Sequence, residues 1–136
     1  MHKRILGRQF SRPDDQRKAL IRSLIASLVL HNKITTTLAK AKELKRIAEK
    51  FLTKAKKGDL ASRRFLNRYL PEATVKKMVN EIAPLFKTRA GGYTRVIKLG
   101  QRQSDSAEMA IIEWVEKPVV VAKPKKKLSK KKNDKK

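Results

Sequence analysis

The chain has 136 residues and carries 36 Lys and Arg against 12 Asp and Glu, a formal charge of +24. It contains no cysteine, which excludes disulfides and thiolate metal sites and fits a reducing compartment. No apolar run approaches the roughly 20 residues that span a bilayer. A charge this large repels itself in a compact chain and therefore indicates a polyanionic partner. Nucleic acid is the partner we favour, over an anionic membrane surface or an acidic protein.

Both ends of the chain are especially basic. Residues 117–136 hold ten Lys and one Asp, and Pro118 and Pro124 interrupt any helix there, so we expect a disordered Lys-rich tail. Residues 1–12 contain no acidic residue and form a flexible basic arm that can order against phosphates. The arm carries Lys3, Arg4, Arg8 and Arg12. We expect residues 13–116, which are also basic, to form one globular domain.

The first predicted helix covers about residues 13–31. Pro13 and the acidic pair after it suit a first helical turn. Its apolar stripe is Leu20, Ile21, Leu24, Ile25 and Leu28. Residues 33–38 are rich in threonine and isoleucine and predict a short strand. Thr37 is the best candidate to cap the helix that follows.

The second predicted helix runs to about Lys57, where Gly58 provides a stop. Its core stripe is Ala41, Leu44, Ala48, Phe51, Leu52 and Ala55. The opposite arc carries Lys42, Arg46, Lys50 and Lys57. This arc is either an ordinary solvated face or a surface that faces phosphates, and its single sign of charge keeps the second explanation open.

Two more helices and a hairpin complete the expected body. Asp59 can cap a helix over residues 60–70, and a fourth follows Pro71 until Pro84 ends or kinks it. Residues 93–99 and 109–115 predict two strands joined by a polar loop, an antiparallel hairpin. The order α-β-α-α-α-β-β predicts a two-layer α+β fold, with the helices packed on one face of a small mixed sheet.

Three motifs go beyond composition. The first is Gly7-Arg8-Gln9-Phe10 with Arg12, continued by Arg17 and Arg22; the second is Ile34-Thr35-Thr36-Thr37 with Ala39-Lys40-Ala41-Lys42-Glu43; the third is Arg89-Ala90-Gly91-Gly92-Tyr93-Thr94-Arg95. Lys56-Lys57-Gly58-Asp59 and Arg63-Arg64 fit the same pattern. In this order and spacing, over residues 1–116, they closely resemble the bacterial large-subunit ribosomal protein L17 family.

The resemblance implies the same order of elements and a role in binding large-subunit rRNA. It implies a position on the solvent side of the ribosome, near the polypeptide exit region, and a cytoplasmic location in ribosomes. The implied partners are the rRNA and neighbouring large-subunit ribosomal proteins. No cofactor, metal, membrane or small-molecule substrate is expected.

Arginine and glycine positions supply most of the candidate RNA contacts. Guanidinium groups bridge two phosphate oxygens in a fixed fork, and paired glycines allow a close backbone approach. Threonine hydroxyls and N–H groups at a helix start suit phosphate or 2′-OH partners, although strand propensity and capping explain them almost as well. The candidates are Lys3, Arg4, Arg8, Arg12, Arg17, Arg22, Thr35, Thr36, Lys40, Lys42, Arg63, Arg64, Arg89, Gly91, Gly92, Tyr93 and Arg95.

An enzyme is disfavoured on the residues alone. His2 and His31 are far apart, and no phosphate-binding loop or cluster with metal-ligand spacing is present. An architectural DNA-binding protein is the main competitor, but the loop 101–106 lacks the apolar wedge that such proteins insert between bases. A peripheral membrane protein is the third class, but the apolar stripes are more typical of helix faces packed together in a core than of a helix that lies on a membrane.

Overall fold

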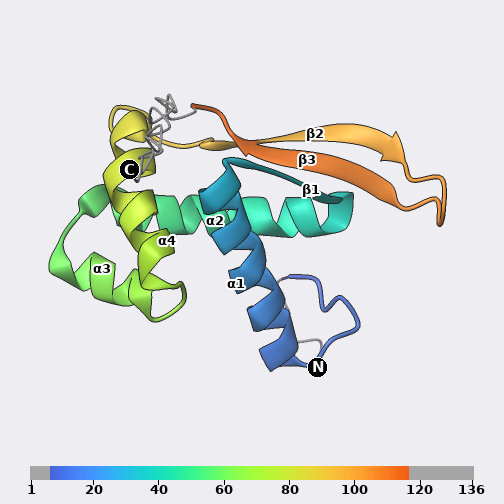
Figure 1. Ribbon diagram of the computed structural model, residues 1–136, viewed down its shortest axis with the longest axis horizontal. Coiled ribbons are helices and arrows are strands. Elements are labelled where there is room, and N and C mark those ends of the chain that lie inside the picture. The colour runs from blue at the N-terminus through green and yellow to red at the C-terminus, as the bar shows by residue number, and fades with distance from the viewer. Residues whose placement is uncertain (1–6, 117–136) are drawn as a thin grey trace, which may run out of the picture.

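The computed structural model describes residues 7–116, so the predictions for Lys3, Arg4 and the Lys-rich tail lie outside the described residues. The predicted order of helices and strands is confirmed (Figure 1). The elements are α1 (Asp14–His31), β1 (Lys33–Thr37), α2 (Leu38–Lys57), α3 (Leu60–Asn67), α4 (Glu72–Lys77), the π-helix η1 (Met78–Ile82), the 3₁₀-helix η2 (Ala83–Phe86), β2 (Thr94–Gln101) and β3 (Glu108–Trp114).

The sheet has the strand order β1-β3-β2 and is antiparallel at both pairings. Ile34 lies opposite Ile112 in one pairing, and Val96 lies opposite the same residue in the other. The prediction of a mixed sheet was therefore wrong. The chain returns from the helices so that β2 runs in the same direction as β1, but the hairpin inserts β3 between them, and the two parallel strands never pair.

Left-handed residues end the first two helices, and the second of them, Gly58, is the stop that the sequence predicts. Asn32 follows α1 with φ 63°, and Gly58 follows α2 with φ 69° and donates its N–H to the carbonyl of Ala55. The Asp59 carboxylate accepts the Ser62 N–H at 3.1 Å and caps α3. Thr37 holds the cap position of α2 but makes no side-chain cap hydrogen bond, because it is still a β1 residue paired with β3.

The third and fourth helices are shorter than predicted. α3 ends at Asn67, and the chain turns back through N–H groups of Tyr69 and Leu70 that both bond the carbonyl of Leu66. After α4 the helix continues as the wider π-helix η1 and then as the narrower 3₁₀-helix η2. Pro84 lies in η2 and has no N–H to continue α-helical bonding.

The core lies between the helices and one face of the sheet. Alternate residues of β3 are fully buried there, namely Ala110, Ile112 and Trp114. The Trp114 indole N–H donates to the carbonyl of Leu28 at 3.3 Å and links β3 to α1. All six predicted core positions of α2 are buried. The helices therefore pack on one face of the sheet, as predicted.

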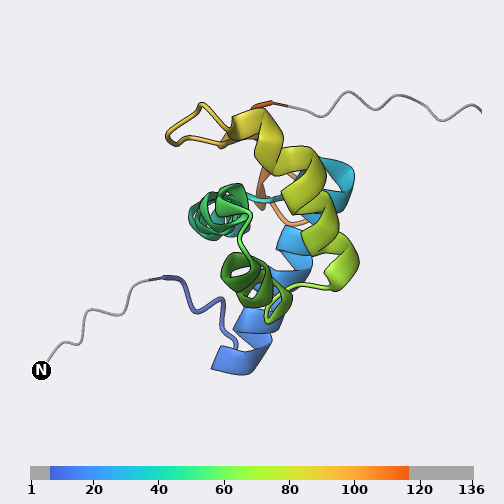
Figure 2. The ribbon, with the colours of Figure 1, turned by 90° about the vertical axis from the view of Figure 1, so that its left-hand side faces the viewer.

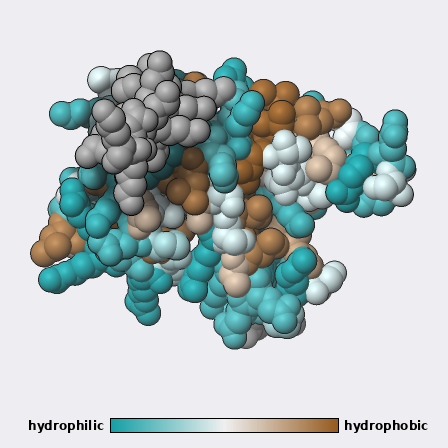
Figure 3. All heavy atoms as spheres, viewed as in Figure 1, coloured by the Kyte–Doolittle hydropathy of each residue, from teal (hydrophilic) through white to brown (hydrophobic). Residues whose placement is uncertain are grey.

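The other face of the sheet is open. Ile97 is 41% exposed and Leu99 is 53% exposed, next to a bulge between Lys98 and Gly100. The space-filling view shows apolar side chains gathered over this hairpin, with hydrophilic ones at its tip (Figure 3). The tip of the hairpin extends past the N-terminal end of α2, so this part of the hairpin has no helix packed beneath it (Figure 1).

Candidate nucleic-acid interface

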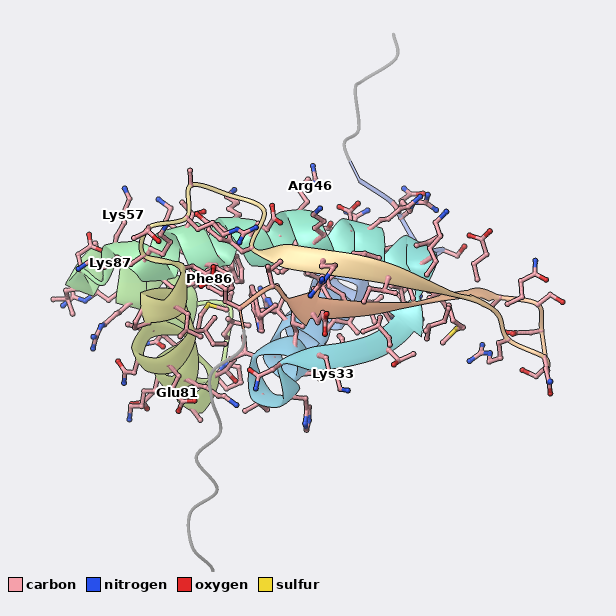
Figure 4. All side chains as sticks on the ribbon, turned by 90° about the horizontal axis from the view of Figure 1, so that it is seen from above. Lys33, Arg46, Lys57, Glu81, Phe86 and Lys87 are labelled. Carbon is pink, nitrogen blue, oxygen red and sulfur yellow. The ribbon has the colours of Figure 1, made fainter. Side chains whose placement is uncertain are left out.

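Three of the predicted contact regions share one flank of the molecule. The segment of residues 7–13, the outer side of α2 and the turn of residues 87–93 all lie on this flank, whereas α4 lies on the other side (Figures 2 and 4). Figure 4 shows Arg46 and Lys57 on this flank and Lys33 and Glu81 on the opposite one. We call this surface the basic flank.

The charge of the basic flank comes largely from α2. This helix holds eight Lys and Arg residues and only Glu43 and Glu49. Glu43 pairs with Arg46 at 2.8 Å between Oε1 and Nη2. Glu49 accepts hydrogen bonds from the backbone N–H and the hydroxyl of Thr94. Both carboxylates are thus engaged by groups of the protein itself, and α2 keeps an excess of positive charge.

Positive charge is also in excess over residues 7–116 as a whole, which contain 24 Lys and Arg against 11 Asp and Glu, a net charge of +13. Asp14 contacts both Arg17 and Lys18, whose hydrogen bonds hold the pKa of this carboxyl below its ordinary value. Asp15 also acts on Lys18, so these four side chains are neutral together and the excess charge comes from other residues.

A groove of about 500 Å³ lies between the N-terminal segment, α1, α2 and α3, and we call it the basic groove. It brings together three predicted residues, Arg8, Arg17 and Arg22. Its rim also includes Lys18, Arg46 and Lys50. The floor consists of apolar and aromatic side chains, which are Ile21, Ile25, Ile47, Phe51, Phe65 and Tyr69. Arg12 is not among the residues that line it; its guanidinium bonds the carbonyl of Phe10 instead.

The glycine turn is the second predicted region on the basic flank. Arg89 donates from Nε to the carbonyl of Gly91 and pairs with Glu116 at 3.4 Å. The Lys56 ammonium bonds the carbonyl of Arg89 at 2.6 Å, which ties the turn to α2. Gly92 has φ 64°, a backbone conformation that favours glycine. Lys57 and Lys87 lie at the same end of the molecule (Figure 4).

Tyr93 does not have the exposure that its predicted role requires. It is 2% exposed, and its ring packs against Phe86 with centroids 5.4 Å apart. Its hydroxyl donates to the carbonyl of Ala90 and accepts from Lys56. A buried ring cannot stack on a base, and the contacts of Tyr93 give it a role in holding the turn, so RNA contact at this residue stays a prediction.

The remaining candidates are dispersed. Thr35 lies on the open face of the sheet and Thr36 on the helix side, opposite Ala110, so the two threonines do not form one site. Arg95 lies on the open face and pairs with Glu113 at 3.1 Å. Arg63 and Arg64 are exposed on α3, and Lys40 and Lys42 lie on α2. Arg63 borders a small separate hollow with Asn67 and Glu72.

Lys18, Arg46, Lys50, Phe65 and Tyr69 are groove residues that the predicted contact set omits. Lys18 and Arg22 stand four residues apart on one helix side, and Arg46 and Lys50 repeat that spacing, so the basic arcs are visible in the sequence. The packing of α1, α2 and α3 makes the two arcs face each other across aromatic rings, and the spacing of residues does not show this packing.

Within residues 7–116, no group of three or more His, Asp or Glu side chains is placed to hold a metal ion. In the same part of the chain, no helix has the length and hydropathy needed to cross a membrane.

The molecule is an antiparallel sheet packed against helices, and one flank carries an excess of Lys and Arg. These features are typical of a small basic protein that binds an anionic partner. The model of the ribosomal protein L17 family matches residues 20–115. The chain is 53% identical over 127 residues to the large ribosomal subunit protein bL17 of Thermodesulfovibrio yellowstonii, covering 93% of this chain and 92% of that protein. It is 50% identical over 109 residues to the bL17 of Caldanaerobacter subterraneus subsp. tengcongensis, covering 79% and 97%. The chain belongs to the ribosomal protein L17 family, and the resemblance read from its motifs is confirmed.

Membership of this family makes the chain a ribosomal protein and not an enzyme. The 127-residue match is longer than residues 1–116. In that relative the similarity therefore extends into the Lys-rich segment, beyond the region that carries the motifs.

Proposed function

We propose that this protein is a structural constituent of the large ribosomal subunit that binds and stabilises folded large-subunit rRNA. The observation that carries the proposal is the basic flank, where groups of the protein engage the two carboxylates of α2 and Lys and Arg side chains remain in excess. The names of the relatives support the subunit assignment. The ribosomes of the bacterial cytoplasm are the proposed location, near the polypeptide exit region.

The proposed mechanism is phosphate-backbone recognition. Each Lys or Arg that reaches a phosphate releases condensed counterions, and rigidly placed guanidinium forks add geometric selectivity. The glycine turn is held by Lys56 and Tyr93 before RNA arrives, which lowers the ordering cost of binding. The described contacts that we retain are Arg8, Arg12, Arg17, Arg22, Lys40, Lys42, Arg63, Arg64, Arg89, Gly91 and Gly92.

The two ends of the chain have separate roles in this proposal. Residues 1–12 act as a basic arm that orders on rRNA, and residues 117–136 add affinity that depends on charge more than on structure. Neighbouring large-subunit proteins are proposed as further partners, and the open face of the sheet is the apolar surface available to them.

Sedimentation of a cell lysate with and without RNase tests the function. We expect the protein to migrate with large subunits and to leave that fraction after RNase treatment. Migration with chromatin or membranes after RNase would contradict the proposal and favour the architectural DNA-binding or membrane alternative.

Deleting residues 118–136 tests the division of roles. We expect weaker rRNA binding with a shallower salt dependence, while incorporation into large subunits persists. A truncated chain that no longer enters subunits would make the tail part of the specific site.

A further inference from the structure

The basic groove contains an aromatic floor that phosphate-backbone binding does not explain. Phe51, Phe65 and Tyr69 form a cluster with ring centroids 5.1 to 6.1 Å apart. Phe51 is buried, whereas Phe65 and Tyr69 are only half-buried and line the groove. Aromatic surface left open beside cations on a binding flank indicates a ligand with an apolar, planar part.

Cations stand over the faces of both outer rings. The guanidinium carbon of Arg22 lies 5.5 Å from the ring centroid of Tyr69, and the Lys54 ammonium lies 5.8 Å from that of Phe65. Lys54 does not line the groove, so the layered platform there consists of Arg22 and the ring of Tyr69. A guanidinium layered on an aromatic ring is the kind of platform on which proteins stack unpaired bases.

The charge of the rim favours an anionic ligand. Six Lys and Arg side chains line the groove against two carboxylates. Asp14 is engaged by Arg17 and Lys18, and Glu43 is engaged by Arg46. A planar apolar ring joined to negative charge describes a nucleotide. An intact RNA helix would place phosphates on the rim but leave the aromatic floor uncovered, since its bases are paired and stacked inside.

We propose that the basic groove receives an unstacked nucleotide of the rRNA, with its base against Tyr69 and Phe65 and its flanking phosphates on the cationic rim. The volume of about 500 Å³ lies within the range of small-ligand pockets and leaves room for the base and its sugar. This inference rests on the proposed function and adds to it a class of RNA structure, a bulge or loop with one base turned out.

A photo-crosslink inside assembled ribosomes tests the occupant directly. Phe65→p-azidophenylalanine retains the ring and places a reactive group at the groove; the same replacement at Glu81, which is exposed on the side opposite the basic flank, is the matched control. After irradiation, nuclease and trypsin treatment, mass spectrometry should find a nucleotide adduct on the peptide of residue 65 and none on the control. A peptide adduct at residue 65, from residues 1–6 or from another protein, or no adduct at all, would overturn the proposal.

Substitution of the stacking ring provides a second readout. Tyr69→Leu keeps an apolar side chain but removes the π face, so binding to purified large-subunit rRNA should weaken about tenfold with an unchanged salt dependence. Thermal unfolding of the variant checks that it is folded. Wild-type affinity in a folded Tyr69→Leu variant would overturn the inference, whereas wild-type protein absent from large subunits would instead overturn the proposed function.

Discussion

Asp105 illustrates how single acidic residues are used in this basic protein. At the tip of the hairpin its carboxylate accepts two hydrogen bonds from Arg102, at 2.9 and 2.7 Å, and one from the N–H of Ala107 at 3.2 Å. The Arg102 hydrogen bonds, followed by the Ala107 N–H, lower the pKa of Asp105 to about 2. The charged form is thus the one that holds the loop.

The lowered pKa of Asp105 predicts when the hairpin tip loses its order. A carboxyl with a depressed folded pKa stabilises the fold above its unfolded pKa, and this contribution is lost as pH falls through the folded value. We expect the amide signal of Ala107 to remain constant from pH 7 to about pH 4 and to shift at lower pH with a midpoint near pH 2. Asp105→Asn is the control, since it should remove this transition. A shift centred near pH 5 would contradict the assignment.

Trp114 joins two elements that are far apart in the sequence. Its indole is fully buried and donates to a carbonyl of α1 from the end of β3. We expect Trp114→Phe to lower the free energy of unfolding by about 2 kcal/mol, because it removes buried volume and leaves the Leu28 carbonyl without this donor. Denaturant unfolding measures the change. Ile97→Val on the open face is the control and should be nearly neutral.

Single elements were predictable where one stripe of residues determines them. All six core positions of α2 follow from spacing alone, because a helix presents every third or fourth residue to one side. The length of α4 did not follow, since η1 and η2 continue its apolar stripe with different hydrogen bonding. The sheet order depends on pairing between Lys33–Thr37 and a strand more than seventy residues later, which local patterns do not encode.

The candidate site was likewise predictable only in part. The basic arcs could be read from spacing, but the groove requires the packing of three helices and the N-terminal segment. An aromatic residue beside two glycines, such as Tyr93, fits a ligand contact as well as a buried brace. Only its burial against Phe86 separates the two.

Element α2 carries a prediction on the salt dependence of rRNA binding. Lys50 lies on the rim of the basic groove, and Lys33 lies at the start of β1 on the opposite flank. Lys50→Gln should reduce the slope of log K against log salt by about 0.7 to 0.9, the value of one phosphate contact. Lys33→Gln removes the same charge and should leave the slope unchanged. Equal effects of the two variants would show that binding does not distinguish the flanks.

The charge of the whole molecule predicts opposite responses to salt before and after binding. A net of +13 on residues 7–116 destabilises the compact state by self-repulsion. Raising the salt from about 0.05 to about 0.5 M should therefore raise the Tm of the free protein, because screening weakens repulsion over about 10 Å. The same change should weaken rRNA binding. A Tm that falls with salt would mean that ion pairs outweigh repulsion.

The open hairpin face gives this charge a second consequence. Ile97 and Leu99 leave an apolar strip uncovered on the edge strand β2, a surface that tends to associate with other chains. While the protein is free, its like charge keeps copies apart; a non-cognate polyanion removes that repulsion without covering the strip. Titration with an unrelated RNA should then cause turbidity near charge equivalence and clearing when RNA is in excess. Ile97→Thr with Leu99→Thr should suppress the turbidity, so the order in which the protein meets its RNA determines whether it assembles or precipitates.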